Sequence, residues 1–222
     1  MKILVACEES QRVCTAFRER GHEAYSCDII ECSGGHPEWH IQGDVLAVLN
    51  PTIVQDGYDN EFLGIKFATC DGFVHYIEGK WDMIIAHPPC TYLSNAGARF
   101  LYPKGVLNEE RLQKGLEAKQ FFMNFYTAKC EKICIENPIP SKIFGLPKYT
   151  QTVQPYEHGH PIQKKTCFWL KGLEPLKPSN IVQERQSTKI AGNWFNKGGK
   201  ERQKNRAKTF PGIAQAMAEQ WG

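Results

Sequence analysis

Short apolar runs alternate with amphipathic stretches in the first part of the chain. The apolar run Lys2–Ala6 is followed by Ser10–Arg20, where apolar residues recur with helical spacing after a serine in the N-cap position. Gly21 ends this predicted helix, and Glu23–Ile29 has the composition of a second strand. A strand–helix–strand unit of this kind is typical of a parallel sheet with crossover helices.

The same alternation returns later in the sequence. A buried strand is predicted at Asp82–Ala86, directly before two prolines, and a long amphipathic helix at Asn108–Lys129. Further strands are predicted at Lys132–Glu136 and Thr166–Leu170, and a closing helix at Ile213–Trp221. We therefore expect an α/β fold of Rossmann-like type, with a mainly parallel sheet and helices on both faces.

A less regular stretch follows the predicted strand His40–Val45. Within it, residues 66–78 form two alternating runs on either side of Asp71-Gly72, a pair that suits a two-residue primed turn. This pattern predicts a small β-hairpin that decorates the sheet without joining its centre.

Positive charge is concentrated in the C-terminal part. The chain has 27 Lys and Arg against 24 Asp and Glu, a formal net charge of +3. From Pro161 onward there are 12 basic and 4 acidic residues, so this part carries +8 and the preceding part −5. A basic segment beside an acidic body favours a polyanionic partner, with a solvated basic tail as the alternative.

Composition also bears on the compartment. Nine cysteines, an odd number spread along 222 residues, favour reduced thiols over a disulfide framework. The sequence contains no apolar run of membrane-spanning length, and the N-terminal residues lack the pattern of a signal peptide. We therefore expect a cytoplasmic protein with no membrane partner and one main core.

Polar residues follow the predicted strands one after another. Ligands of open α/β sheets bind at the carboxyl ends of the strands. There the sequence places Cys7–Ser10, Asp28, Asp44, His87–Cys90 and Glu136-Asn137. Two acids after early strands suit the hydroxyl and amino groups of a nucleoside-like cofactor. A cysteine and a carboxylate after later strands suit covalent chemistry with a neighbouring proton donor.

Four segments resemble motifs of the cytosine-5 DNA methyltransferase family, especially its short phage-type members. Pro88-Pro89-Cys90 with Ser94 resembles the family's Pro-Pro-Cys-Gln-x-Phe-Ser loop, and Glu136-Asn137 its Glu-Asn-Val element. Gln163-Lys164-Lys165 is similar to its Gln-x-Arg-x-Arg element, and Phe210–Trp221 to its terminal segment. The matches follow the family's order across nearly the whole chain. The resemblance implies a methyltransferase fold, S-adenosylmethionine as cofactor and DNA as partner.

The resemblance also implies a covalent mechanism. Cys90 would add to carbon 6 of cytosine, which makes carbon 5 nucleophilic towards a methyl sulfonium. Glu136 would hold ring nitrogen 3 and the exocyclic amine, and Lys165 would take the part of a family arginine that steadies the base. A target inside duplex DNA would have to be flipped out of the helix.

Binding residues follow from the same resemblance. Asp28 would accept hydrogen bonds from the ribose, Asp44 would contact the adenine amine, and free N–H groups near Ser10 would receive the methionine carboxylate. The expected cofactor-binding set is Cys7, Glu8, Ser10, Asp28, Asp44 and Pro88. The expected substrate-binding set is Ser94, Asn137, Lys164, Lys197, Lys200 and Arg202.

The chain also departs from the family pattern. Cys7–Ser10 stands where the family has a glycine-rich loop, and lysines replace arginines that make bidentate contacts. Only Lys171–Asn205 is available as a target-recognition region. We expect a catalytic domain at 1–170, a short basic insertion at 171–208, and a terminal helix at 209–222 that returns to the catalytic domain.

Other hypotheses remain open. The same chemistry could act on a free pyrimidine nucleotide, or the chain could be an inactive protein that binds nucleic acid or modulates a partner. Cys32, His36 and His40 have spacing that invites a zinc site, but the intervening Gly and Pro residues oppose a regular helix, and we expect no metal. His158 and His160 could contact phosphate or only shape a loop.

Overall fold

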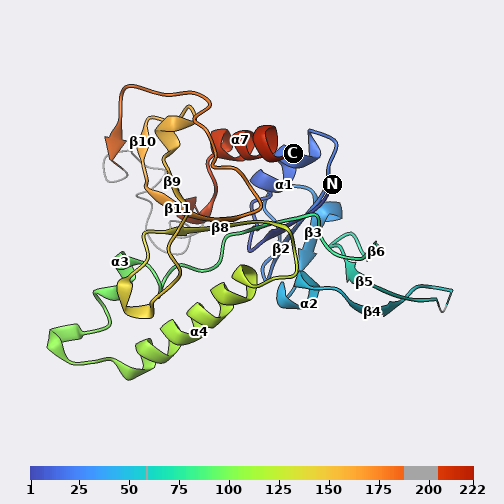
Figure 1. Cartoon of the computed structure of the whole chain (residues 1–222), viewed down its shortest axis with the longest axis horizontal. Helices are drawn as coiled ribbons and strands as arrows, with labels where there is room; N and C mark the ends of the chain where they lie inside the picture. Colours follow the sequence, from blue (N-terminus) through green and yellow to red (C-terminus); the bar gives the residue numbers. More distant parts are fainter. Residues whose placement is uncertain (59, 188–204) are drawn as a thin grey trace.

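A seven-stranded sheet runs through the protein in the computed structural model, which describes residues 1–58, 60–187 and 205–222 (Figure 1). Its strands are β1 (Lys2–Ala6), β2 (Glu23–Asp28), β3 (His40–Gln42), β7 (Met83–Ala86), β8 (Lys132–Pro138), β9 (Gln151–Val153) and β11 (Thr166–Lys171). The strand order is β3-β2-β1-β7-β8-β11-β9, and of these seven strands only β11 runs opposite to the others. The predicted mainly parallel α/β sheet is confirmed.

The strand order reverses direction at the centre of the sheet. From β1 the chain builds outward through β2 to β3, and it then returns to place β7 on the other side of β1. Such a reversal leaves a crevice at the carboxyl ends of the two central strands, where ligands of doubly wound sheets bind. In this protein the crevice lies between Cys7, after β1, and His87, after β7.

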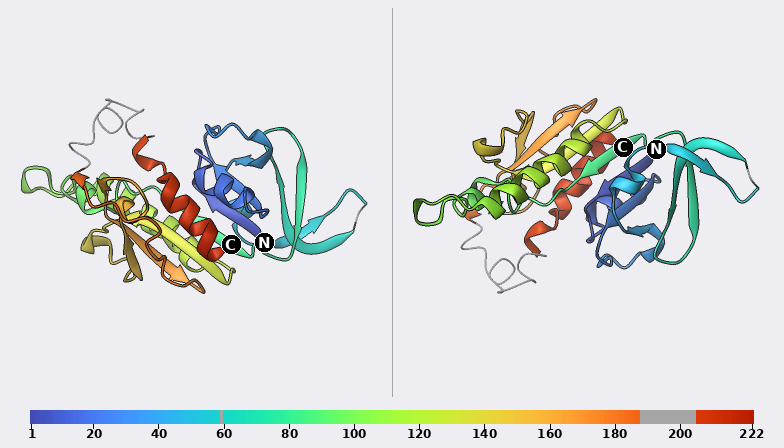
Figure 2. Two further views of the ribbon diagram at one scale, coloured as in Figure 1. Left: turned by 90° about the horizontal axis from the view of Figure 1, so that it is seen from above. Right: turned by 90° about the horizontal axis from the view of Figure 1, so that it is seen from below.

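Helices cover both faces of the sheet, as predicted (Figure 2). On one face, α1 (Arg12–Arg18) and α7 (Pro211–Trp221) pack against alternate residues of the central strands. On the other face lie α2 (Leu46–Leu49) and α4 (Glu109–Tyr126). The alternation is plain in β1: Ile3 and Val5 belong to the α1/α7 core, and Leu4 and Ala6 to the α4 core. Two buried faces explain why the strand has no polar residue after Lys2.

The helices begin differently from one another. Asn108 accepts a hydrogen bond from the Arg111 N–H and starts α4 close to the predicted position. In contrast, the prediction of Ser10 as the N-cap of α1 is wrong. The N-cap is Gln11, and its side chain makes no capping bond. A carboxylate from the preceding loop satisfies the free N–H groups instead, and it makes a serine cap unnecessary.

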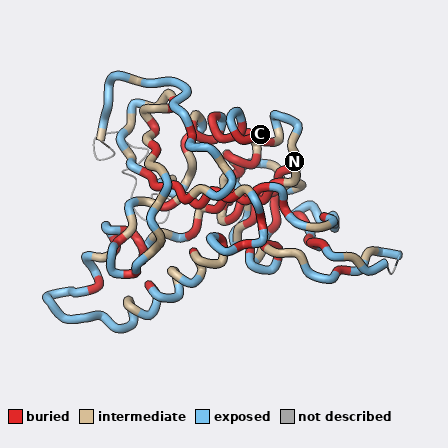
Figure 3. The backbone as a smooth tube through the Cα atoms, viewed as in Figure 1, coloured by how far each residue is buried: buried red, intermediate tan, exposed pale blue. Residues whose placement is uncertain are grey.

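The predicted hairpin is confirmed as part of a separate three-stranded antiparallel sheet. This sheet comprises β4 (Thr52–Gln55), β5 (Glu61–Ala68) and β6 (Val74–Glu78), and its tip is exposed (Figure 3). The predicted two-residue turn at Asp71-Gly72 is wrong, because Gly72 has φ 89° whereas Asp71 stays outside the left-handed region. The Thr69 N–H bonds to the Phe73 carbonyl, so three residues form the loop.

The C-terminal segments close one side of the molecule. Short strands β10 (Ile162–Gln163) and β12 (Gln186–Ser187) pair with each other, and α3 (Asn95–Ala98) follows the loop after β7. Within the predicted insertion at 171–208, the described residue Leu176 is buried in the α1/α7 core. Trp221 of α7 donates a hydrogen bond to the Glu174 carbonyl. This part of the insertion is therefore joined to the main body.

In the part of the chain that the structure describes, no helix is long and apolar enough to cross a membrane.

Candidate active site

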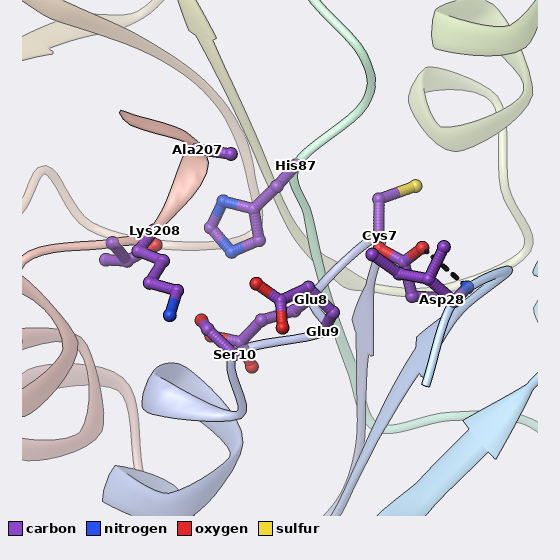
Figure 4. Close-up of a pocket in the computed structure, with 10 residues that line it drawn as sticks. Cys7, Glu8, Glu9, Ser10, Asp28, His87, Ala207 and Lys208 are labelled. Atoms are coloured by element: carbon purple, nitrogen blue, oxygen red, sulfur yellow. Dashed lines mark hydrogen bonds between the residues drawn. The ribbon is translucent and has the colours of Figure 1, made fainter. Parts of the chain in front are cut away.

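Two cavities open at the carboxyl edge of the sheet, and both are bordered by Cys7 and Asp28. The larger, about 510 Å³, extends over β2 and β3 towards α4. The smaller, about 340 Å³, lies over the β1–α1 junction (Figure 4). Additional lining residues of the larger cavity include Asp44, Pro89, Tyr92 and Phe121, and those of the smaller include Glu8, Ser10, His87, Lys208 and Thr209.

Glu8 acts as the cap of α1. One carboxylate oxygen accepts the Val13 N–H at 2.7 Å, and the other accepts the Cys14 N–H at 3.2 Å. Burial raises the pKa of Glu8, while the charge of His87 and these two N–H groups oppose the rise. The N–H groups that we expected to receive a cofactor carboxylate are thus occupied by Glu8, and that prediction is corrected.

The β1–α1 loop adopts glycine-like backbone angles without glycine. Cys7 has φ 59° and Gln11 φ 56°, values that cost a residue with a side chain about 1–2 kcal/mol each. Gln11 compensates with its buried amide, which accepts the His36 N–H at 3.0 Å and donates to the His36 carbonyl at 2.8 Å. The loop therefore makes its left-handed turn without glycine, and Cys7 and Gln11 adopt the required backbone angles.

Asp28 and Asp44 lie where the sequence predicted, at neighbouring strand ends beside the larger cavity. Asp28 accepts the Ile30 N–H at 3.2 Å, and burial raises its pKa against the effect of the nearby backbone N–H groups. Asp44 is exposed and accepts the Leu46 N–H at 3.0 Å. Each of these bonds uses one carboxylate oxygen, so the two side chains keep acceptor capacity for a ligand.

His87 and Glu136 form a buried pair that joins the ends of β7 and β8. Nδ1 of His87 lies 3.1 Å from Oε2 of Glu136, with the two side chains 6% and 18% exposed. Burial alone would lower the pKa of His87, but the hydrogen bond and charge of Glu136, together with Glu8, raise it. Burial likewise opposes ionisation of Glu136, but His87 and then Lys164 lower its pKa. Both shifts favour an imidazolium beside a carboxylate.

Cys90 follows His87 by three residues in the loop after β7 and is partly exposed. Burial raises the pKa of its thiol, and the charge of Glu136 raises it further, while Lys164 opposes both effects. The charge of Glu136 therefore reaches Cys90, and their joint catalytic role stays a prediction. The resting thiol is protonated more readily than a free cysteine.

Other predicted residues position this segment. Asn137 is fully buried, and its Nδ2 donates to the Pro88 carbonyl at 3.3 Å. Pro88 is buried, and its neighbour Pro89 borders the larger cavity instead. Ser94 caps α3 by accepting the Gly97 N–H, and its own N–H bonds to the Cys90 carbonyl. These contacts explain how Cys90 is held, and any substrate contacts of these residues stay predictions.

Of the two predicted lysines, Lys164 is the one beside the pair. It borders a small cavity together with Glu136, and its amine donates to the Arg206 carbonyl at 2.8 Å. Lys165 is exposed, and its charge reaches Cys167 instead. The three remaining predicted substrate residues, Lys197, Lys200 and Arg202, lie outside the described residues.

The histidines considered in the sequence have structural partners. His40 bonds through both ring nitrogens to Ser26 and to the Ile30 carbonyl. His158 pairs with Ser179, and His160 accepts the Gly212 N–H at the start of α7. Among the described residues, no three His, Cys, Asp or Glu side chains are grouped to hold a metal ion.

Sequence reasoning gave no role to three cavity residues. His87 was visible at a predicted strand end, directly before Pro88, and that position was the available signal. Lys208 and Thr209 reach the smaller cavity because α7 packs against α1, a contact that local pattern does not reveal.

No protein-family model matches the chain, and no curated protein gives a significant match to its sequence.

Proposed function

We propose that this chain is a methyltransferase that uses S-adenosylmethionine to methylate carbon 5 of cytosine in DNA through a covalent adduct at Cys90. One observation carries the proposal: the charge of Glu136, in β8, acts on the thiol of Cys90, in the loop after the neighbouring strand β7, beside the switch point of a doubly wound sheet. A nucleophile beside a group that can hold the pyrimidine is what covalent addition to carbon 6 requires.

The cavities suit the proposed cofactor. Both fall within the ~300–1,000 Å³ of ordinary small-molecule sites, and they meet at Asp28, where a ribose would have a hydrogen-bond acceptor. Pro89 and Phe121 offer apolar walls for an adenine ring in the larger cavity, with Asp44 at its margin. The smaller, more polar cavity has room for the amino-acid end. S-adenosylmethionine supplies an electrophilic methyl group when bound.

Residues of this chain would carry out the addition to carbon 6, the binding of the base and the final elimination. The Cys90 thiolate bonds to carbon 6, and Glu136 holds nitrogen 3 and the exocyclic amine. Carbon 5 would take the methyl group and then lose its proton to solvent. The electron pair of that C–H bond would re-form the 5,6 double bond as the bond between sulfur and carbon 6 breaks to restore the thiolate. Lys164 opposes the negative charge of Glu136 near the thiol and so favours the thiolate.

A nucleic-acid substrate is supported by the loop after Cys90. Phe100 and Tyr102 are about half exposed, at 50% and 52%. The Arg111 guanidinium lies 4.9 Å from the Tyr92 ring centroid, and Arg99 lies 4.5 Å from that of Phe100. Exposed aromatic rings combined with arginines suit stacked bases and phosphates.

Mass spectrometry tests the proposal. In separate reactions, the protein and S-adenosylmethionine are incubated with single-stranded DNA, with duplex DNA or with deoxycytidine nucleotides. We expect 5-methylcytosine in DNA, and a covalent adduct when 5-fluorocytosine replaces cytosine. Cys70→Ser, which changes an exposed cysteine on the separate sheet, serves as the matched control. Methylation of nucleotides alone would favour the nucleotide hypothesis, and absence of both methylation and adduct would refute the proposal.

A further inference from the structure

His87 lies between two carboxylates that belong to different parts of the site. Its Nδ1 contacts Glu136, whereas Nε2 has no hydrogen-bond partner among the described residues. Nε2 is buried, yet the ring borders the smaller cavity and stands over Glu8 (Figure 4). A buried ring nitrogen without a hydrogen-bond partner lowers the stability of the fold, and such atoms are rare in proteins. A functional role for the nitrogen would explain the arrangement.

We propose that His87 is a positioning residue that supplies, through Glu136, the proton that nitrogen 3 of the pyrimidine takes up when Cys90 adds to carbon 6. This inference rests on the proposed function. The ring can pass a proton only if one nitrogen touches the acceptor and the other faces a space from which the proton is replaced. Nδ1 meets the first condition through Glu136, and the ring that carries Nε2 borders the cavity beside Glu8.

The electron and proton movements balance. As sulfur bonds to carbon 6, the π pair of the 5,6 bond moves to the bond between carbons 4 and 5. The π pair of the bond between carbon 4 and nitrogen 3 then settles on nitrogen 3. The Glu136 carboxylate takes the Nδ1 proton of His87 and passes a proton on to nitrogen 3, so that Glu136 is a carboxylate again and His87 is neutral. Elimination reverses each transfer, so the relay consumes no net proton.

The charges around His87 favour this role. Glu136 and Glu8 face it from β8 and from the β1–α1 loop, and both stabilise the imidazolium. Lys164 acts in the opposite direction, and Lys208 borders the same cavity. The effect of the two carboxylates exceeds that of burial and of Lys164, so the ring keeps a proton at a pH where free histidine has lost it. Glu136, kept ionised by its partner, has no proton of its own to give.

Exchange of the carbon 5 hydrogen tests the relay without any methyl donor. While sulfur is bound to carbon 6, carbon 5 can take a proton from water and release its original hydrogen. A DNA oligonucleotide with tritium at carbon 5 of its cytosines therefore reports each cycle of addition and elimination. In the wild type we expect the tritium release rate to fall as the pH rises through the raised pKa of His87.

Two variants make the test specific. His87→Asn keeps an amide near the Nδ1 position that can bond to Glu136 but cannot deliver a proton. We expect release about 10²-fold slower and no decline at high pH. Glu8→Gln removes one charge beside the ring and should move the decline to lower pH. His36→Asn, a change outside both cavities, should match the wild type.

The possible failures can be told apart. If the wild type releases tritium with no decline at high pH, or if His87→Asn retains the wild-type rate and decline, the relay is refuted and the proposed function stands. If the wild type neither releases tritium nor forms the 5-fluorocytosine adduct, the proposed function is refuted and the relay with it. Because the first criterion uses the wild type alone, it holds even if the variants fold poorly.

Discussion

Two pairs of buried polar side chains beside the crevice differ in how their hydrogen bonds are satisfied. At the β1–α1 junction, both oxygens of Glu8 and both ends of the Gln11 amide have backbone partners. At the β7–β8 side, Nε2 of His87 and Oδ1 of Asn137 are buried without a partner among the described residues. Polar groups that are satisfied internally stabilise the fold, whereas those left unsatisfied are available to a ligand or a reaction.

The largest expected effect of a substitution is on chemistry at the β7–β8 side. Cys90→Ser should lower methyl transfer at least about 10³-fold, which corresponds to about 4 kcal/mol, because a hydroxyl adds to carbon 6 far less readily. Its free energy of unfolding should stay within about 0.5 kcal/mol of the wild type. Activity assays and denaturant unfolding measure the two quantities. Retained activity would remove Cys90 from the mechanism.

A substitution at the β1–α1 junction should instead affect stability. Glu8→Ala leaves the Val13 and Cys14 N–H groups buried without an acceptor, and it should lower the free energy of unfolding by about 2–4 kcal/mol. Glu19→Ala, at the exposed C-cap of the same helix, should change it by less than about 0.5 kcal/mol. Urea unfolding of both variants is the measurement. Equal stabilities would show that Glu8 is not the cap.

Cofactor affinity should depend on the boundary between the two cavities. Asp28→Asn should weaken binding of S-adenosylhomocysteine by about 1–3 kcal/mol, because a charged acceptor for the ribose is lost. Asp56→Asn, in the loop between β4 and β5 and outside both cavities, should leave the affinity unchanged. Isothermal calorimetry gives both dissociation constants. An unchanged constant in Asp28→Asn would place the nucleoside elsewhere.

The smallest expected effect is on the pH dependence of stability. The folded-state pKa of His87 is raised, so its contribution is complete below its ordinary value of 6.5 and is lost as the pH rises through the folded value. The pKa of Glu136 is lowered from 4.5, so its contribution is lost as the pH falls through that lower value. His87→Gln should remove this dependence between neutral and alkaline pH. Parallel stability profiles of the variant and the wild type would contradict an ionised pair.

Sequence periodicity predicted the elements of the central sheet better than their connections. The apolar runs of β1, β7 and β8 are buried on both faces, so local composition was sufficient to find them. The cap of α1 and the turn at Asp71-Gly72 depend on a carboxylate or a backbone angle outside the repeating pattern. Those two predictions failed for that reason.

The same distinction applies to the site. Cys90, Glu136, Asp28 and Asp44 follow directly from strand ends, which parallel topology brings to one edge. Which lysine reaches Glu136 depends on the path of the chain between β10 and β11. Two adjacent lysines in a sequence give no means of choosing between Lys164 and Lys165.

The packing of α7 on α1 has a consequence for how the protein folds. Arg12 donates to the Thr209 carbonyl across 197 positions of sequence, and Thr209 forms part of the smaller cavity. Contacts between such distant positions close only after a large loss of chain entropy, and they slow folding. During synthesis, β1 and α1 leave the ribosome long before α7 exists. The cavity therefore acquires its last wall at a late stage, and a nascent chain has no complete site with which to capture a ligand.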